Sequence, residues 1–141
     1  MRLISFFIIH CSAVRPNQSS SAADIDRWHR ARGFNSIGYH FVVRRDGSIE
    51  TGRPMEKVGA HCLNRNAHSI GICYEGGLDA NGKPADTRTP QQKEALRKLL
   101  QQLHEQFPKA IIAGHNMFNP MKACPCFDAM REYADLQPKG G

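Results

Sequence analysis

The chain has no hydrophobic run long enough to cross a membrane. Its longest apolar run, residues 3–9, is interrupted by Ser5 and is about a third of the ~20 residues that a transmembrane helix needs. A secretory signal is also not expected, because only Arg2 precedes this run and no small-residue cleavage site follows it. We therefore expect a protein that is made in the cytoplasm, without a signal peptide, and that does not associate with membranes.

The number of cysteines does not favour a disulfide framework. They are Cys11, Cys62, Cys73, Cys124 and Cys126. An odd number without a secretory signal argues against a set of stabilising bridges, and at least one thiol must be unpaired within the chain. A bridge from Cys62 to Cys73 is conceivable, but no feature of the sequence supports it.

Acidic residues are in the minority, which leaves a formal net charge of +6. Such a charge favours contact with polyanions, but it does not select among nucleic acids, anionic lipids and bacterial wall polymers. The basic residues are scattered and lack the interleaved aromatic residues of a single-strand binding groove. We expect a basic, solvated surface and no dedicated nucleic-acid binding.

The length and composition suit one ordinary soluble domain. With 141 residues, of which 40% are hydrophobic and 23% charged, the chain can bury roughly two thirds of the surface that its unfolded form exposes. We expect a monomer with a single domain over residues 1–141 and a short C-terminal tail from about residue 136.

Short runs of β-branched and aromatic residues predict the strands of this domain. The Asp46-Gly47 pair predicts a hairpin turn. Strands are expected at residues 3–10, within a hairpin at 37–53, at 69–77 and at 110–115.

Capping residues predict two helices between these strands. The first is expected at about residues 22–32, between a Ser21 cap and Gly33. The second helix begins at a capping box that starts with Thr89, and this helix ends before Pro108. With a further short helix after Cys126, these elements predict an α/β domain with a central mixed β-sheet flanked by helices.

Two of the predicted strands end in a histidine, His10 and His115. Open α/β sheets place their sites at strand ends, so the two imidazoles converge if the strands are neighbours. The segment KACPCFD, residues 122–128, brings Cys124 and Cys126 within one loop of His115. Two histidines and one cysteine would hold Zn²⁺ with a fourth position open to water.

Spacing alone leaves simpler interpretations open. A histidine at a strand end is more often only hydrogen-bonded, and a buried cysteine is more often a small hydrophobe. The KACPC thiols could also be a redox pair or a staple, although two cysteines separated by one proline are poorly placed to bridge each other. His29 and His104 lie on predicted helices and are expected at the surface.

Several segments, in order along the chain, carry a family resemblance. They are IIHCSA (8–13), GYHFVVRRDGSIETGR (38–53), VGAHCLNRNAHSIGICYEGG (58–77), TPQQ (89–92), GHN (114–116) and KACPCFD (122–128). Together they resemble the zinc-dependent N-acetylmuramoyl-L-alanine amidases of type 2, whose fold the peptidoglycan recognition proteins share. The resemblance runs from residue 7 to about residue 131 and implies the fold of that family.

The resemblance also implies a metal site with one Zn²⁺ per chain. The ligands would be His10, His115 and Cys124, because Cys124 rather than Cys126 matches the cysteine of the family's motif. Cys126 departs from the family pattern and receives no role.

Two further residues, Tyr39 and Lys122, match catalytic positions of the phage-type amidases. Lys122 would place positive charge beside the developing oxyanion, and Tyr39 could hydrogen-bond the attacking water or the same oxyanion. Without the resemblance, Tyr39 would be taken as a packing aromatic. His40 would point to the opposite face of the strand and is not counted.

Substrate contacts are implied for three polar residues of the resembling segments, Arg53, His61 and Asn66. Ordinary hydrogen bonding within loops is the competing interpretation for each of them.

The resemblance implies zinc-dependent hydrolysis of the amide bond between N-acetylmuramic acid and L-alanine in peptidoglycan. An endolysin of a phage or prophage, released to the cell wall during lysis, and a cytoplasmic enzyme that recycles muropeptides both fit the sequence. A recognition module that binds peptidoglycan without cleaving it is the alternative from another class. Retention of all three ligand types argues against that alternative.

Overall fold

A computed structural model of the chain describes residues 2–139, so residues 1, 140 and 141 of the expected domain lie outside it. The fold is α/β, with one five-stranded sheet in the order β3-β2-β4-β1-β5. Its strands are β1 (Phe6–Cys11), β2 (Phe41–Val43), β3 (Ile49–Thr51), β4 (Ser69–Tyr74) and β5 (Ile111–Gly114). Adjacent strands are parallel except for the β2-β3 hairpin, which is antiparallel. The predicted mixed sheet is confirmed.

The helices of the structure differ in length. The longer two are α1 (Ala22–Ala31) and α2 (Pro90–Gln106), and the short ones are α3 (His115–Phe118) and α4 (Ala129–Glu132), with 3-10 turns at Asn66–His68 and Ala134–Leu136. The predicted cap at Ser21 and the predicted capping box at Thr89 are both present, and the Ser21 cap also forms a capping box, with Asp24. Within residues 2–139, no helix is long and apolar enough to span a membrane.

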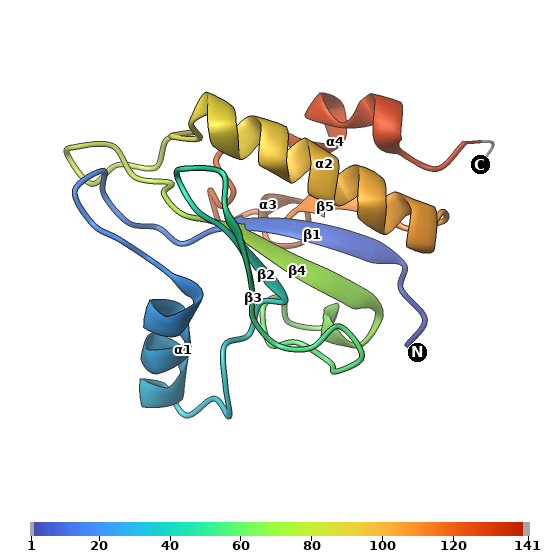
Figure 1. Ribbon diagram of the computed structural model, residues 1–141, viewed down its shortest axis with the longest axis horizontal. Helices are drawn as coiled ribbons and strands as arrows, with labels where there is room; N and C mark the ends of the chain where they lie inside the picture. The colour runs from blue at the N-terminus through green and yellow to red at the C-terminus, as the bar shows by residue number, and fades with distance from the viewer. Residues whose placement is uncertain (1, 140–141) are drawn as a thin grey trace.

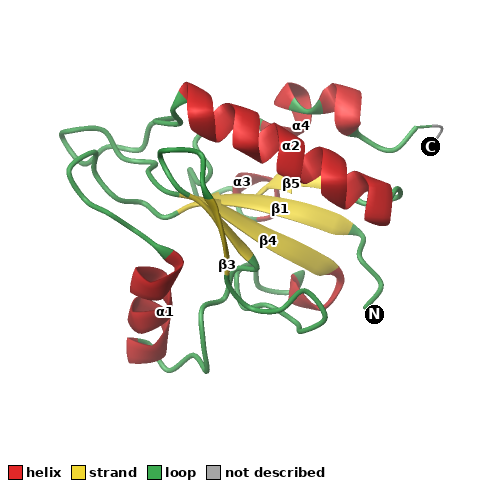
Figure 2. Cartoon of the chain, in the orientation of Figure 1, coloured by secondary structure: helices red, strands yellow, loops and turns green. Residues whose placement is uncertain are grey.

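The sheet separates a packed face from a more open one (Figure 1, Figure 2). On the packed face, α2 lies along the sheet, and its leucines join the alternate side chains Phe7 and Ile9 of β1 in the main core. On the other face, α1 stands apart, and a smaller cluster joins its Ile25 to Val42 and Cys73 of the sheet. Residues of α1 and His10 of β1 line a cleft on this second face.

The element bounds differ from the predicted ones mainly at the strand ends. β1 extends one residue past His10 to Cys11, and β5 ends at Gly114, so that His115 is the first residue of α3. The hairpin strands are only three residues each. His104, expected at the surface, is half-buried on α2. Its Nε2 atom is buried and has no hydrogen-bond partner in the described part of the chain.

Glu75, just after β4, is a buried acid that ties three segments together. Its carboxylate accepts hydrogen bonds from the backbone N–H groups of Ser20 (2.6 Å) and Arg45 (2.9 Å) and from Nε of Arg44 (3.1 Å). Burial raises the pKa of Glu75, but the hydrogen bonds from Arg44, Ser20 and Arg45 outweigh it and bring the pKa below its usual value. The folded state therefore favours the charged form.

We expect E75Q to reduce the free energy of unfolding at pH 7 by about 2 kcal/mol, since hydrogen bonds to a charged group contribute about that much. Because the folded-state pKa is lower than the unfolded value of 4.5, this stabilisation is present above the unfolded value and is lost as the pH falls through the folded one. Urea unfolding of both proteins should show a difference that shrinks below about pH 4.5. E105Q, at an exposed position of α2, is the matched control. A difference that stays constant between pH 7 and pH 3 would contradict this role of Glu75.

Candidate active site

The two histidines of the predicted metal site come together at the carboxyl edge of the sheet. β1 and β5 are parallel neighbours, and Ile9 pairs with Gly114. His10 follows Ile9 and His115 follows Gly114, and the ring centroids of the two histidines lie 4.6 Å apart. The register of two adjacent parallel strands is therefore what brings these imidazoles together.

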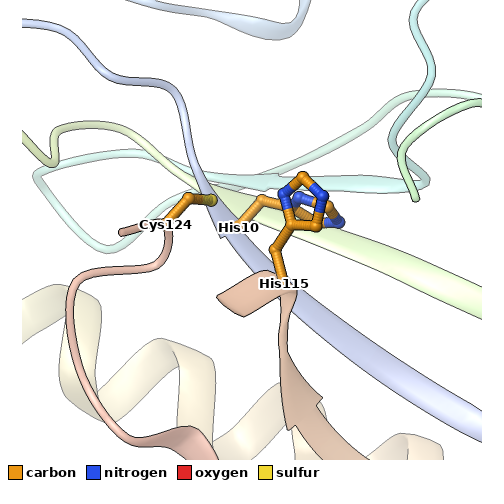
Figure 3. A group of neighbouring side chains, drawn as sticks. All are labelled: His10, His115 and Cys124. Atoms are coloured by element: carbon orange, nitrogen blue, oxygen red, sulfur yellow. The ribbon is translucent and has the colours of Figure 1, made fainter. Parts of the chain in front are cut away.

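Cys124 reaches the histidines from the loop that follows α3. Its Sγ accepts a hydrogen bond from the backbone N–H of Cys11 (3.1 Å), and its carbonyl oxygen accepts one from the N–H of Asn116 (2.8 Å). The hydroxyl of Tyr74 also donates to the carbonyl oxygen of Pro125 (2.7 Å). These contacts fix the loop, and one ligand atom from each of His10, His115 and Cys124 lies within 4.8 Å of the others (Figure 3).

Cys126 takes a different direction. Its thiol lies 3.4 Å from the carbonyl oxygen of Gly77, and it lines a second cavity rather than the cleft that contains Cys124. Burial, followed by the nearby Cys11, raises the pKa of Cys126 to about 12, so it remains a thiol at neutral pH. All five cysteines lie in the described part of the chain and are free, so the conceivable bridge from Cys62 to Cys73 is not formed.

His61 contacts His10 from the loop before β4. Its Nδ1 lies 2.9 Å from Nε2 of His10, a hydrogen bond between two imidazoles, and its Nε2 lies 3.1 Å from Oγ of Ser69. Gly71 of β4 makes this position possible, because a Cβ at residue 71 would lie 2.6 Å from the His61 ring. The absence of a side chain at Gly71 thus allows His61 to lie across the sheet.

The imidazoles of the site are held in their neutral form. Burial lowers the pKa of His10 well below its usual value, and the neighbouring histidines, first among them His61, lower it further. The pKa of His61 falls to about 3, mainly through burial. Burial and then the charge of Lys122 lower the pKa of His115. Neutral imidazoles have the free lone pairs that a metal ion requires.

These groups line a cleft of about 660 Å³ between α1, the loop over residues 60–66 and the loop after α3. Tyr39 lines this cleft, with its ring centroid 5.0 Å from that of His10. Burial raises the pKa of Tyr39 well above its usual value, so its hydroxyl stays protonated and can donate a hydrogen bond. Lys122 lines the same cleft from an exposed position.

The three residues expected to contact substrate occupy different places. His61 and Asn66 line the cleft, although Oδ1 of Asn66 also accepts hydrogen bonds from the backbone N–H groups of His61 and Cys62. Arg53 is not among the lining residues. Its guanidinium donates instead to the carbonyl oxygens of Ser36, Ile37 and Val58, and so it braces neighbouring loops.

His29 was expected at the surface, and that expectation is wrong. Its side chain is buried, its Nδ1 accepts a hydrogen bond from the backbone N–H of Gly38 (2.9 Å), and its ring centroid lies 5.4 Å from that of Tyr39. A signal for this was present in the sequence, because Ile25, His29 and Arg32 have the four- and three-residue spacing of one helical face. All three line the cleft.

His40 lies outside the cleft lining, in agreement with its exclusion from the site. Its Nδ1 accepts a hydrogen bond from the backbone N–H of Gly71 (3.0 Å), and its Nε2 lies 2.8 Å from the carbonyl oxygen of Lys57. The first of these bonds requires the ring proton on Nε2, where it can be donated to Lys57.

The donor set of the site fits zinc. Two neutral imidazoles and one thiol, with a backbone N–H directed at the sulfur, match the nitrogen and sulfur ligands that Zn²⁺ prefers. Three protein ligands would leave one coordination position of a zinc ion for water, which is the arrangement of catalytic rather than structural zinc sites.

Comparison with known proteins agrees with this geometry. Residues 1–127 match the family described as N-acetylmuramoyl-L-alanine amidase. The endolysin of Enterobacteria phage K11 is 44% identical over 127 residues, which cover 90% of this chain and 83% of that protein.

Solved structures give the same result. The N-acetylmuramoyl-L-alanine amidase LysC from Clostridium intestinale URNW aligns with a TM-score of 0.80 at 29% identity, covering 96% of this chain and 86% of that one. Drosophila PGRP-LB aligns with a TM-score of 0.77 at 26% identity, covering 95% and 81%. The fold and the resemblance inferred from the sequence are therefore confirmed, and the chain belongs to the N-acetylmuramoyl-L-alanine amidase family as an enzyme of that activity.

Proposed function

We propose that the chain is a zinc-dependent endolysin that hydrolyses the amide bond between N-acetylmuramic acid and L-alanine of peptidoglycan. The observation that carries the zinc dependence is the convergence of His10, His115 and Cys124 in a cleft that Tyr39 and Lys122 also line. The lytic role is supported by the 44% identity to the phage K11 endolysin.

The residues around the proposed ligands would hold them ready for the metal. The hydrogen bond to His61 occupies Nε2 of His10 and leaves Nδ1 for the ion. The backbone N–H of Cys11 would stabilise a thiolate at Cys124, since such donors favour the charged form of an acceptor. Contacts of this kind orient metal ligands and tune their basicity.

When bound, zinc would supply Lewis acid chemistry that polarises the scissile carbonyl and makes a water molecule acidic enough to attack near neutral pH. The ammonium group of Lys122 would then stabilise negative charge as it develops on the carbonyl oxygen. The Tyr39 hydroxyl, kept protonated by burial, would donate a hydrogen bond to that oxygen or orient the attacking water. His61 and Asn66 line the same cleft and would contact the substrate beside the scissile bond.

Digestion of purified peptidoglycan tests the metal, the reaction and the bond together. We expect mass spectrometry to show new L-alanine amino termini, their loss when a chelator removes the metal, and their return when Zn²⁺ is added back. Undiminished cleavage by protein shown to be free of metal would contradict the zinc dependence. Products cut at a different bond would contradict the specificity.

The same assay separates the endolysin from its two alternatives. A recognition module would bind peptidoglycan without releasing amino termini. An enzyme that recycles muropeptides would cleave soluble muropeptides and leave intact wall material uncut. Clearing of a wall suspension by this protein is the result expected of an endolysin.

A further inference from the structure

Within residues 2–139, Arg32 at the end of α1 has no acidic partner, unlike Arg27 and Arg30 on the same helix. On the same helix, Arg27 pairs with Asp24 at 2.8 Å and Arg30 pairs with Asp26 at 2.7 Å. For Arg32, no ion pair and no side-chain hydrogen bond is formed with any group of residues 2–139. Its guanidinium, with all of its donors, is therefore available to a ligand.

The position of Arg32 is set by the end of α1. Arg32 follows Ile25 and His29 on the helical face that lines the cleft. Gly33 has a φ of +96°, which turns the chain back so that the N–H of Phe34 donates to the carbonyl oxygen of His29 (3.0 Å). The Phe34 ring is thereby placed under Arg32, whose guanidinium carbon lies 5.1 Å from the ring centroid. Such stacking holds an arginine in place without using its hydrogen-bond donors.

The charge of the cleft indicates what Arg32 would bind. Among the described residues, no aspartate or glutamate lines the cleft, whereas Arg32 and Lys122 both do. Lys122 acts near the metal site, where its charge contributes, after burial, to the lowered pKa of His115. Arg32 acts at the α1 wall, where its charge contributes, after burial, to the lowered pKa of His29. The cleft therefore has a second cation that the proposed chemistry does not use.

Carboxylate is the ligand that fits this cation. The planar guanidinium matches a carboxylate with two parallel hydrogen bonds. In a muropeptide, the sugars are N-acetylated and neutral, and the lactyl acid is consumed in the scissile amide. All free carboxylates of the substrate are therefore on its peptide.

We propose that Arg32 determines specificity by binding the free carboxylate of the peptide residue that follows L-alanine, with Phe34 stacked beneath the guanidinium. The peptide half of the substrate then lies along α1, and the glycan lies toward the opposite wall, formed by residues 60–66. This inference rests on the proposed function, because it assigns one part of the proposed substrate to one wall of the same cleft.

The test uses two N-acetylmuramoyl tetrapeptides that differ only at the second peptide residue, which carries either a free α-carboxylate or a carboxamide. The wild-type enzyme should cleave the acid with a kcat/KM about 10- to 100-fold higher, the range expected for hydrogen bonds to a charged group. R32Q should cleave the two substrates with equal kcat/KM, because its KM for the carboxylate substrate rises. R32K should recover part of the preference for the carboxylate substrate. R30Q is the matched control, since Arg30 is paired with Asp26 and is not among the residues of the cleft, and it should keep the full preference.

Equilibrium binding to zinc-depleted protein, measured by calorimetry, separates this inference from the proposed function. If the acid peptide binds more tightly than the amide peptide to wild type and not to R32Q, while the zinc-loaded wild-type enzyme cleaves neither peptide, the proposed hydrolysis fails and the role of Arg32 stands. Equal affinity of wild type for both peptides, or a preference that R32Q retains, would overturn the role of Arg32 whatever the activity.

Discussion

Replacement of Cys124 by serine is expected to remove zinc and to lower wall-lytic activity by at least about 100-fold, since losing even an outer contact of a zinc ligand costs 10- to 100-fold. The reason is geometric as well as chemical. Cys124 supplies the sulfur within 4.8 Å of the ligand nitrogens of His10 and His115, and a serine hydroxyl is a much weaker donor for a soft or borderline metal. Zinc content per chain, measured by atomic absorption, and the rate of clearing of a wall suspension are the two readouts.

Cys126→Ser is the matched control, made two residues away in the same loop. The thiol of Cys126 is directed at the carbonyl oxygen of Gly77, and a hydroxyl can donate to that oxygen in its place. We expect this variant to keep one zinc per chain and near wild-type activity. The reverse result, zinc lost in Cys126→Ser and retained in Cys124→Ser, would show that the wrong thiol has been assigned.

The choice between the two thiols shows where sequence reasoning was sufficient. Apolar runs and capping residues predicted the sheet and both long helices, because burial and local hydrogen bonding act over a few residues. The pairing of His10 with His115 could be anticipated, because both follow apolar strand segments and parallel strands end at the same edge. The family resemblance then favoured Cys124, and the backbone N–H of Cys11 directed at its sulfur gives a structural reason for the same choice.

Other features of the site depend on tertiary packing, which local sequence patterns indicate only in part. His29 and Arg32 share a helical face with Ile25, but which face of α1 lines the cleft depends on how the helix packs on the rest of the fold. The contact of His61 with His10 requires the space left by Gly71, a residue on a different segment. A substrate contact is predicted for Arg53 because it is polar and lies in a resembling segment. Its donors are directed at backbone carbonyls, and the substrate contact stays a prediction.

Replacement of Lys122 by methionine should lower kcat about 100- to 1000-fold while zinc stays bound, which is the usual cost of removing one donor that stabilises an oxyanion. Lys122 is exposed and makes no ion pair within residues 2–139, so its replacement leaves packing intact and the thermal midpoint should stay close to that of wild type. Because the ammonium would act on charge that develops during the reaction, the loss should fall on kcat more than on KM. K122R, which keeps the charge in a different shape, should recover part of the activity.

Lys109→Met is the control for loss of a surface charge, because Lys109 is also exposed but precedes β5, at the opposite end of the strand from His115. Single-turnover measurements on a soluble muropeptide, with zinc content determined on the same samples, distinguish a catalytic role from a role in metal retention. If K122M loses zinc together with activity, Lys122 supports the metal site rather than the oxyanion. If K122M keeps both, it is a solvated lysine at the edge of the cleft, and stabilisation of the developing charge falls to Tyr39, whose hydroxyl is the remaining donor that we assign to this chemistry.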